Sequence, residues 1–217
     1  MTYEEKIMTI VEEISEKLQA GKSKDIKVLV PQALEEGVDA RVILEEGLLA
    51  GMNIVGTKFK SNEIFVPEVL IAARAMKAGT EILKPYLVSE NVKPVGKVII
   101  GTVKGDLHDI GKNLVKMMLE GKGLEVIDLG VDVAPETFVD TAIAENADII
   151  CCSALLTTTM WEMKNVVDLA SERGIRDKVK IMIGGAPITE EFCRDVGADV
   201  YTPDAATCAE VARSFFD

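Results

Sequence analysis

The spacing of apolar residues changes at Lys97, and this change limits the folds open to the chain. Before it, apolar residues recur at intervals of three and four, which is typical of amphipathic helices. After it, they gather in short β-rich runs separated by helical stretches. We therefore expect two domains, an all-α domain over 1–88 and an α/β domain over 97–217, joined by a linker over 89–96.

Breaks in the helical spacing divide the first half into about four helices. They fall near 21–22, 37–39 and 61–63. Asp39 and the segment 61–63 have the composition of helix starts. Four helices of this length predict a small four-helix bundle. The linker segment contains proline and glycine and shows no periodicity.

The second half predicts five strands that alternate with five helices. Strands are expected at 98–103, 125–129, 148–153, 180–183 and 199–202. Helices are expected at 112–120, 135–146, 160–173, 190–196 and 205–216. Helices of this length suit right-handed crossovers between parallel strands. We therefore expect a doubly wound, five-stranded parallel sheet of flavodoxin-like order 2-1-3-4-5.

Composition excludes several classes of partner. The 217 residues carry 36 acidic and 24 basic side chains, so the net charge of −12 would repel nucleic acid. The sequence has no uncharged apolar run long enough for a membrane span and no secretory signal at its start. We therefore expect a cytoplasmic protein that binds neither nucleic acid nor membrane.

Unusual residues follow four of the predicted strands. They occupy 102–111, 153–158, 184–187 and 202–205. The carboxyl ends of parallel strands meet at one edge of a sheet, and ligands bind outside that edge in open α/β folds. We therefore expect the site where these segments meet.

The segment after the first strand holds the single histidine, His108. One histidine excludes a multi-histidine zinc site. Asp106 lies two residues earlier, a spacing that lets its carboxylate hold one imidazole nitrogen and leave the other free for a ligand. Gly111 removes a side chain where a bulky partner would approach. The four cysteines contain no C-x-x-C pair and are expected to be buried structural thiols.

These residues carry a resemblance to a known family. The run from Asp106 to Gly111 resembles the D-x-H-x-x-G motif of cobalamin-binding proteins, and 153–155 with 184–185 resemble its S-x-L and G-G elements. The helical half, at 51–59, 65–67 and 72–77, is similar to the cap domain of cobalamin-dependent methionine synthase. The whole chain is most similar to small corrinoid proteins of the methanol, methylamine and aromatic O-demethylase systems.

The resemblance implies a set of site residues. His108 would take the lower axial position on cobalt, with the cofactor's own base withdrawn, and Asp106 would hold the other ring nitrogen. Ser153 would extend this hydrogen-bond chain or contact the displaced base. Further cofactor contacts are implied for Val103, Gly105, Asp109, Ile110, Gly111, Leu155, Thr157, Thr158, Gly184, Gly185, Tyr201 and Asp204. From the helical cap, Phe59 and Val66 would cover the upper face.

The resemblance also implies the function. A corrinoid subunit of this kind carries a methyl group on cobalamin, whose cobalt cycles between Co(I) and methyl-Co(III). It moves the group from a substrate-specific methyltransferase to an acceptor methyltransferase that uses tetrahydrofolate or a thiol, and a reductive activase reduces cobalt that has been oxidised to Co(II) back to Co(I). Such a carrier is not expected to catalyse a reaction alone. The methyl donor stays open among methoxyaromatics, methylamines, methanol and betaines.

Three alternatives remain at this point. The cobalamin-binding subunit of a carbon-skeleton mutase shares the fold but does not normally carry a helical cap. A cobalamin-dependent sensor would place a DNA-binding domain before the bundle, and no basic helix-turn-helix segment precedes it here. A flavodoxin-like or receiver domain would use Asp106 or Asp109 as an acidic site. A receiver also requires an aspartate after strand three and a lysine after strand five, which this sequence lacks.

Overall fold

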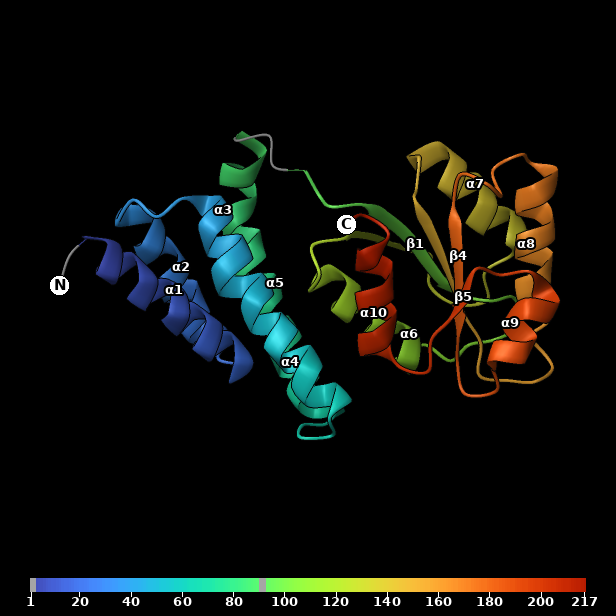
Figure 1. Ribbon diagram of the computed structural model, residues 1–217, viewed down its shortest axis with the longest axis horizontal. Helices are drawn as coiled ribbons and strands as arrows, with labels where there is room; N and C mark the ends of the chain where they lie inside the picture. Colours follow the sequence, from blue (N-terminus) through green and yellow to red (C-terminus); the bar gives the residue numbers. More distant parts are fainter. Residues whose placement is uncertain (1–2, 90–92) are drawn as a thin grey trace. The chain divides into compact units, whose positions relative to one another are not determined.

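The computed structural model describes residues 3–89 and 93–217. The chain divides into two compact units, with the boundary between Pro94 and Val95. The first unit is helical and the second combines a sheet with helices (Figure 1). Part of the predicted linker, residues 90–92, lies outside the described residues.

The first unit is the expected helical bundle. Its elements are α1 (Tyr3–Gln19), α2 (Ser23–Glu35), α3 (Ala40–Val42), η1 (Ile43–Leu49), α4 (Ala50–Lys60) and α5 (Val66–Ser89). The three central elements follow one another without a break, so the described part of the unit contains four helical rods. Ile14, Leu18, Ile26, Leu48 and Leu83 are completely buried. The three-and-four spacing places them on inward faces.

One of the two predicted helix starts lies at the expected position, and the other lies a few residues later. The Asp39 side chain accepts a 2.8 Å hydrogen bond from the Arg41 N–H, which caps the helix that begins at Ala40. The segment 61–63 instead forms a turn, and α5 begins only at Val66. There the Glu68 carboxylate accepts the N–H of Phe65 at 3.0 Å, and this bond takes over the capping role.

The second unit contains the expected parallel sheet. Its strands are β1 (Lys97–Thr102), β2 (Glu125–Asp128), β3 (Ile149–Ser153), β4 (Lys180–Gly184) and β5 (Val200–Tyr201). All pairs are parallel and the order is β2-β1-β3-β4-β5, which confirms the prediction. Thr102 lies opposite Ser153, and Ser153 lies opposite Gly184. The ends of three strands are therefore level at the carboxyl edge.

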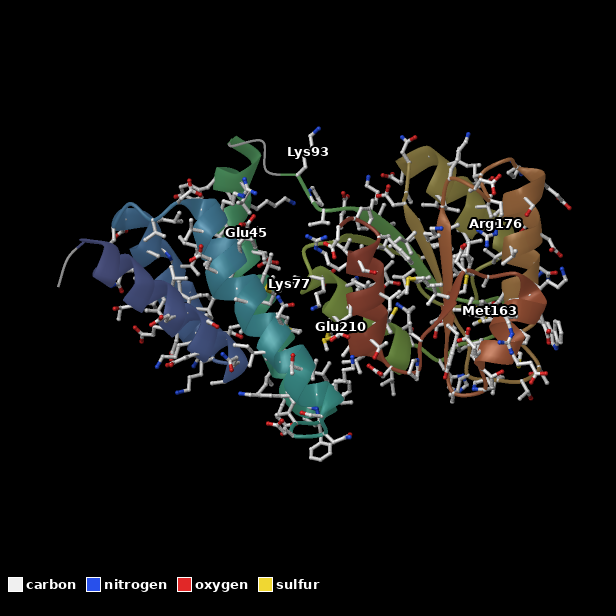
Figure 2. The ribbon with its side chains drawn as sticks, viewed as in Figure 1. Glu45, Lys77, Lys93, Met163, Arg176 and Glu210 are labelled. Atoms are coloured by element: carbon white, nitrogen blue, oxygen red, sulfur yellow. The ribbon has the colours of Figure 1, made fainter. Side chains whose placement is uncertain are left out.

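Helices cover both faces of this sheet. They are α6 (Ile110–Glu120), α7 (Pro135–Glu145), α8 (Glu162–Glu172), α9 (Glu190–Val196) and α10 (Ala205–Ser214). Figure 1 shows α7 and α8 on one face and α6 and α10 on the other. The main core lies on the α7 and α8 side and includes Phe138, Ile150 and Met163, the last of which is labelled in Figure 2. All four cysteines are buried and free, as expected. No described helix is long and apolar enough to span a membrane.

The aromatic ring of Phe138 provides a test of this core. Phe138 has no exposed surface, and a Cβ added at Gly101 would lie 2.7 Å from its ring. We expect Phe138→Ala to lower the free energy of unfolding by about 3–5 kcal/mol, because the small strand residue cannot refill the cavity. Urea unfolding followed by the fluorescence of Trp161, the only tryptophan, measures this change.

The matched control is Ile143→Ala on the same helix. Ile143 is 42% exposed, so its truncation should cost less than about 1 kcal/mol. Equal losses in the two variants would contradict the assignment of Phe138 to the core.

Candidate functional site

The loop between β1 and α6 presents His108 at the carboxyl edge of the sheet. The carboxylate of Asp106 accepts the backbone N–H of His108 at 3.1 Å, which is the local turn that aspartate favours. The Thr102 hydroxyl donates to the carbonyl oxygen of His108 at 3.0 Å. Because Thr102 is fully buried at the end of β1, the histidine backbone is tied directly to the sheet.

The His108 ring is held on one side and open on the other. Its Nδ1 lies 2.7 Å from Oδ1 of Asp106. The histidine side chain is 51% exposed, whereas that of Asp106 is completely buried. A carboxylate beside Nδ1 favours the tautomer with hydrogen on that nitrogen, so the Nε2 lone pair is available to a metal. The two-residue spacing therefore produces the arrangement expected from it.

The Asp106 carboxylate is fixed from several directions. Its second oxygen accepts hydrogen bonds from the N–H of Leu155 at 2.8 Å, the N–H of Leu156 at 3.2 Å and the hydroxyl of Thr159 at 2.9 Å. Burial opposes ionisation, but these bonds and those from His108 outweigh it and hold the pKa of Asp106 well below its usual range. The carboxylate is therefore ionised and rigid.

Thr159 is a site residue that sequence reasoning missed. The resemblance implies that Ser153 extends the chain beyond Asp106 or contacts the displaced base, and the hydroxyl bonded to Asp106 is that of Thr159. Thr159 is 9% exposed, whereas Thr157 and Thr158 are exposed. Three consecutive threonines give no sequence signal for which one turns inward. Ser153 instead lines a neighbouring cavity.

A cavity of about 270 Å³ opens beside the loop, between the sheet and helices α6 and α10. Six of the predicted cofactor contacts line it: Gly111, Ser153, Gly184, Gly185, Tyr201 and Asp204. Much of the remaining wall is apolar and includes Ile100, Leu114 and Met182. The two faces of the sheet thus differ, since α7 and α8 enclose a filled core.

The glycines at this edge have two separate explanations. A Cβ at Gly111 would meet no atom within 4 Å, and one at Gly184 would meet only the Thr202 carbonyl oxygen at 3.6 Å. Gly185 has φ of +132°, and a Cβ there would lie 1.8 Å from the Ala154 carbonyl oxygen. The fold itself therefore requires glycine at 185, while 111 and 184 leave open space for a ligand.

Other residues of the second unit that were predicted to contact the cofactor lie in different environments. Val103 is buried in the core, and Gly105 forms a turn with φ of +79°. Asp204 caps α10 by accepting the Thr207 N–H at 2.8 Å, so it also has a role in the fold. Exposed residues of the same edge are Asp109, Thr157 and Thr158.

An exposed apolar rim borders the histidine loop. Leu107 is 70% exposed, Ile110 79% and Leu155 44%. Leucine and isoleucine rarely gather in the open unless a partner covers them. The sequence resemblance named Ile110 and Leu155 but not Leu107.

The predicted cap residues belong to the helical unit. Phe59 lies near the end of α4 and Val66 at the start of α5, on either side of the turn at 61–64. Both are half-buried, and neither belongs to the buried core. Phe65, between them in sequence, is 64% exposed.

The fold and site together define a protein that presents one carboxylate-held imidazole beside a cavity of about 270 Å³. A family model described as the B12 binding domain matches residues 96–212, and a second B12 binding domain model matches residues 10–84. The chain therefore belongs to the B12-binding family, among the corrinoid proteins of methyltransferase systems.

Individual relatives agree with this assignment. The chain is 40% identical over 205 residues to dimethylamine corrinoid protein 2 of Methanosarcina acetivorans, covering 94% of each chain. It is 47% identical over 176 residues to trimethylamine corrinoid protein 2 of the same organism, covering 80% of this chain and 81% of the other. A crystal structure of the methanol:cobalamin methyltransferase complex of Methanosarcina barkeri superimposes with a TM-score of 0.86 at 31% identity, covering 96% of this chain and 80% of that chain.

The Asp106 network predicts a pH-dependent loss of stability. Because its pKa is lower in the folded than in the unfolded chain, ionised Asp106 stabilises the fold above the unfolded pKa of about 4. This contribution is lost progressively as the pH falls below that value. We expect Asp106→Asn to lower the free energy of unfolding at pH 7 by about 1–3 kcal/mol, since the amide brings a donor to a site filled with donors.

Urea unfolding of the apo-protein at pH 7 and at pH 3 checks this expectation. The difference between wild type and Asp106→Asn should shrink at the lower pH. A difference that stays constant between the two pH values would contradict an ionised Asp106.

Proposed function

We propose that the protein binds cobalamin with His108 as the lower axial ligand of cobalt and with the cofactor's own base withdrawn into the cavity. The observation that carries this proposal is the exposed His108 ring, held at Nδ1 by buried Asp106, beside a cavity of about 270 Å³. A single imidazole that is held at Nδ1 and free at Nε2 suits a metal that arrives with its other ligands already in a macrocycle.

Residues of the second unit support different parts of such a cofactor. The apolar rim of Leu107, Ile110 and Leu155 offers a surface for a flat, largely apolar ring system. The open space beside Gly111 and Gly184 offers room for the nucleotide tail. Asp106 fixes the ring of His108 and increases its basicity toward the metal, as carboxylates beside metal-bound histidines do.

The protein's role is that of a methyl carrier. Bound cobalamin supplies a cobalt that accepts a methyl group from a substrate-specific methyltransferase and passes it to an acceptor methyltransferase using tetrahydrofolate or a thiol. We propose a methylated amine as the donor, because relatives with 40% and 47% identity are named for dimethylamine and trimethylamine. A reductive activase would return oxidised cobalt to the cycle, and Phe59 and Val66 would shield the upper face from water.

The axial ligand is tested by His108→Ala. Wild-type apo-protein reconstituted with hydroxocobalamin should show a base-off spectrum. His108→Ala should change this spectrum, because no other imidazole exists in the chain to take its place. We expect at least about tenfold weaker retention of the cofactor and a loss of methyl transfer to the acceptor. Absorption spectroscopy after desalting measures the first effect.

Lys104→Ala is the control, since Lys104 is exposed in the same loop. It should leave spectrum and retention unchanged. If His108→Ala and wild type had the same spectrum and the same methyl-transfer rate, the assignment of His108 as a cobalt ligand would be contradicted.

The cavity is tested by Gly184→Val. A side chain at this strand position meets only one atom of the fold within 4 Å of its Cβ, so the apo-protein should keep its stability within about 1 kcal/mol. The added methyl groups would occupy the cavity that Gly184 lines, and affinity for hydroxocobalamin should fall at least about tenfold. Isothermal titration with hydroxocobalamin measures the affinity, and undiminished affinity would exclude this cavity as the tail site.

A further inference from the structure

We propose that Asp132, in the loop between β2 and α7, is a positioning residue for the axial histidine. It acts by clamping the backbone of Gly105 and Asp106, shortly before His108, and this inference rests on the proposed function. Nothing in the sequence motif points to Asp132, which lies 24 residues after the histidine. The argument comes from hydrogen bonds between two loops.

Asp132 holds two consecutive residues of the histidine loop. Its Oδ1 accepts the N–H of Gly105 at 2.7 Å. Its own N–H donates to the carbonyl oxygen of Asp106 at 2.9 Å. One residue therefore holds both Gly105 and Asp106, through its side chain and its backbone. Asp106 in turn holds the ring and the backbone N–H of His108, so the position of the imidazole depends on this contact.

The other hydrogen bonds between the segments after β1 and β2 end before Gly105. Sheet-like backbone bonds join Thr102 to Gly130 at 3.0 Å and Val133 to Thr102 at 3.0 Å, and Val103 bridges Val133. These contacts fix the strand end itself. Beyond Val103 the chain turns at Gly105, and Asp132 provides the bonds from the neighbouring loop that continue past the strand.

The backbone of Asp132 indicates that its carboxylate matters. Its φ is +54°, a left-handed conformation that costs aspartate less than most residues but that glycine adopts freely. The residue is exposed, so burial of its side chain does not offset this cost. The interaction that its side chain adds over glycine is the bond to Gly105.

The test compares three substitutions at Asp132 with one control. Asp132→Ala removes the acceptor, Asp132→Gly removes it without strain at positive φ, and Asp132→Asn keeps an oxygen that can accept the same bond. Asp148→Ala is the control, because the Asp148 carboxylate accepts the Lys97 N–H at 2.8 Å at the opposite end of β1. It removes the same kind of bond away from the histidine.

The measurements are hydroxocobalamin affinity, the absorption spectrum of the loaded protein and amide hydrogen exchange at Gly105 in the apo-protein. We expect about tenfold weaker binding for Asp132→Ala and Asp132→Gly, with a smaller base-off, histidine-ligated fraction. Exchange at Gly105 should be roughly tenfold faster in both. Asp132→Asn and Asp148→Ala should behave like wild type.

Specific outcomes would overturn the inference. Asp132→Ala and Asp132→Gly could match Asp148→Ala in hydroxocobalamin affinity and in Gly105 exchange. That result would show that the clamp does not position the histidine. A loss in Asp132→Asn as large as in Asp132→Ala would exclude the hydrogen bond as its cause. Failure of the wild type to take up hydroxocobalamin would instead contradict the proposed function, and Gly105 exchange would still test the clamp.

Discussion

The buried carboxylate of Asp106 is the interaction on which the site depends. It accepts hydrogen bonds from the loops after β1 and β3, and one of its partners is the exposed ring of His108. A buried charge is costly unless it is fully hydrogen-bonded, so the two loops can pack only in the arrangement that satisfies it. The direction of the imidazole is therefore a consequence of how the carboxyl edge of the sheet folds.

The two faces of the sheet perform different tasks. On one face, Phe138 and Met163 are fully buried in the core under α7 and α8. On the other, Gly184 and Ser153 face a cavity under α6 and α10. A well-packed face provides the stability that a domain with an open cavity would otherwise lack. The division lets the domain keep an open cavity on one face without losing its fold.

Sequence reasoning succeeded where a local pattern decides the structure. The strand order and the crossover helices follow from the hydrophobic spacing. The contact between Asp106 and His108 follows from their separation of two residues in the chain. It failed where distant segments meet. Thr159 reaches Asp106 across 53 residues, and neither it nor Asp132 has a distinguishing neighbour in the chain. The resemblance implies a cofactor contact for Gly185, which lines the cavity, and the Ala154 backbone also requires glycine there, because one glycine can serve both purposes.

The cavity wall is also prepared electrostatically before any ligand arrives. Lys112 lines the cavity with 2% of its side chain exposed, and its ammonium donates to Asp128 and Asn113. Burial opposes ionisation of Asp128, but bonds from Lys112 and the Gly130 N–H outweigh it and lower the pKa of Asp128. Because Lys112 is already paired and buried when the chain folds, its charge need not be dehydrated when a ligand enters the cavity. The cost of desolvation then offsets less of the favourable free energy of binding, which is how a preorganised cavity wall raises affinity.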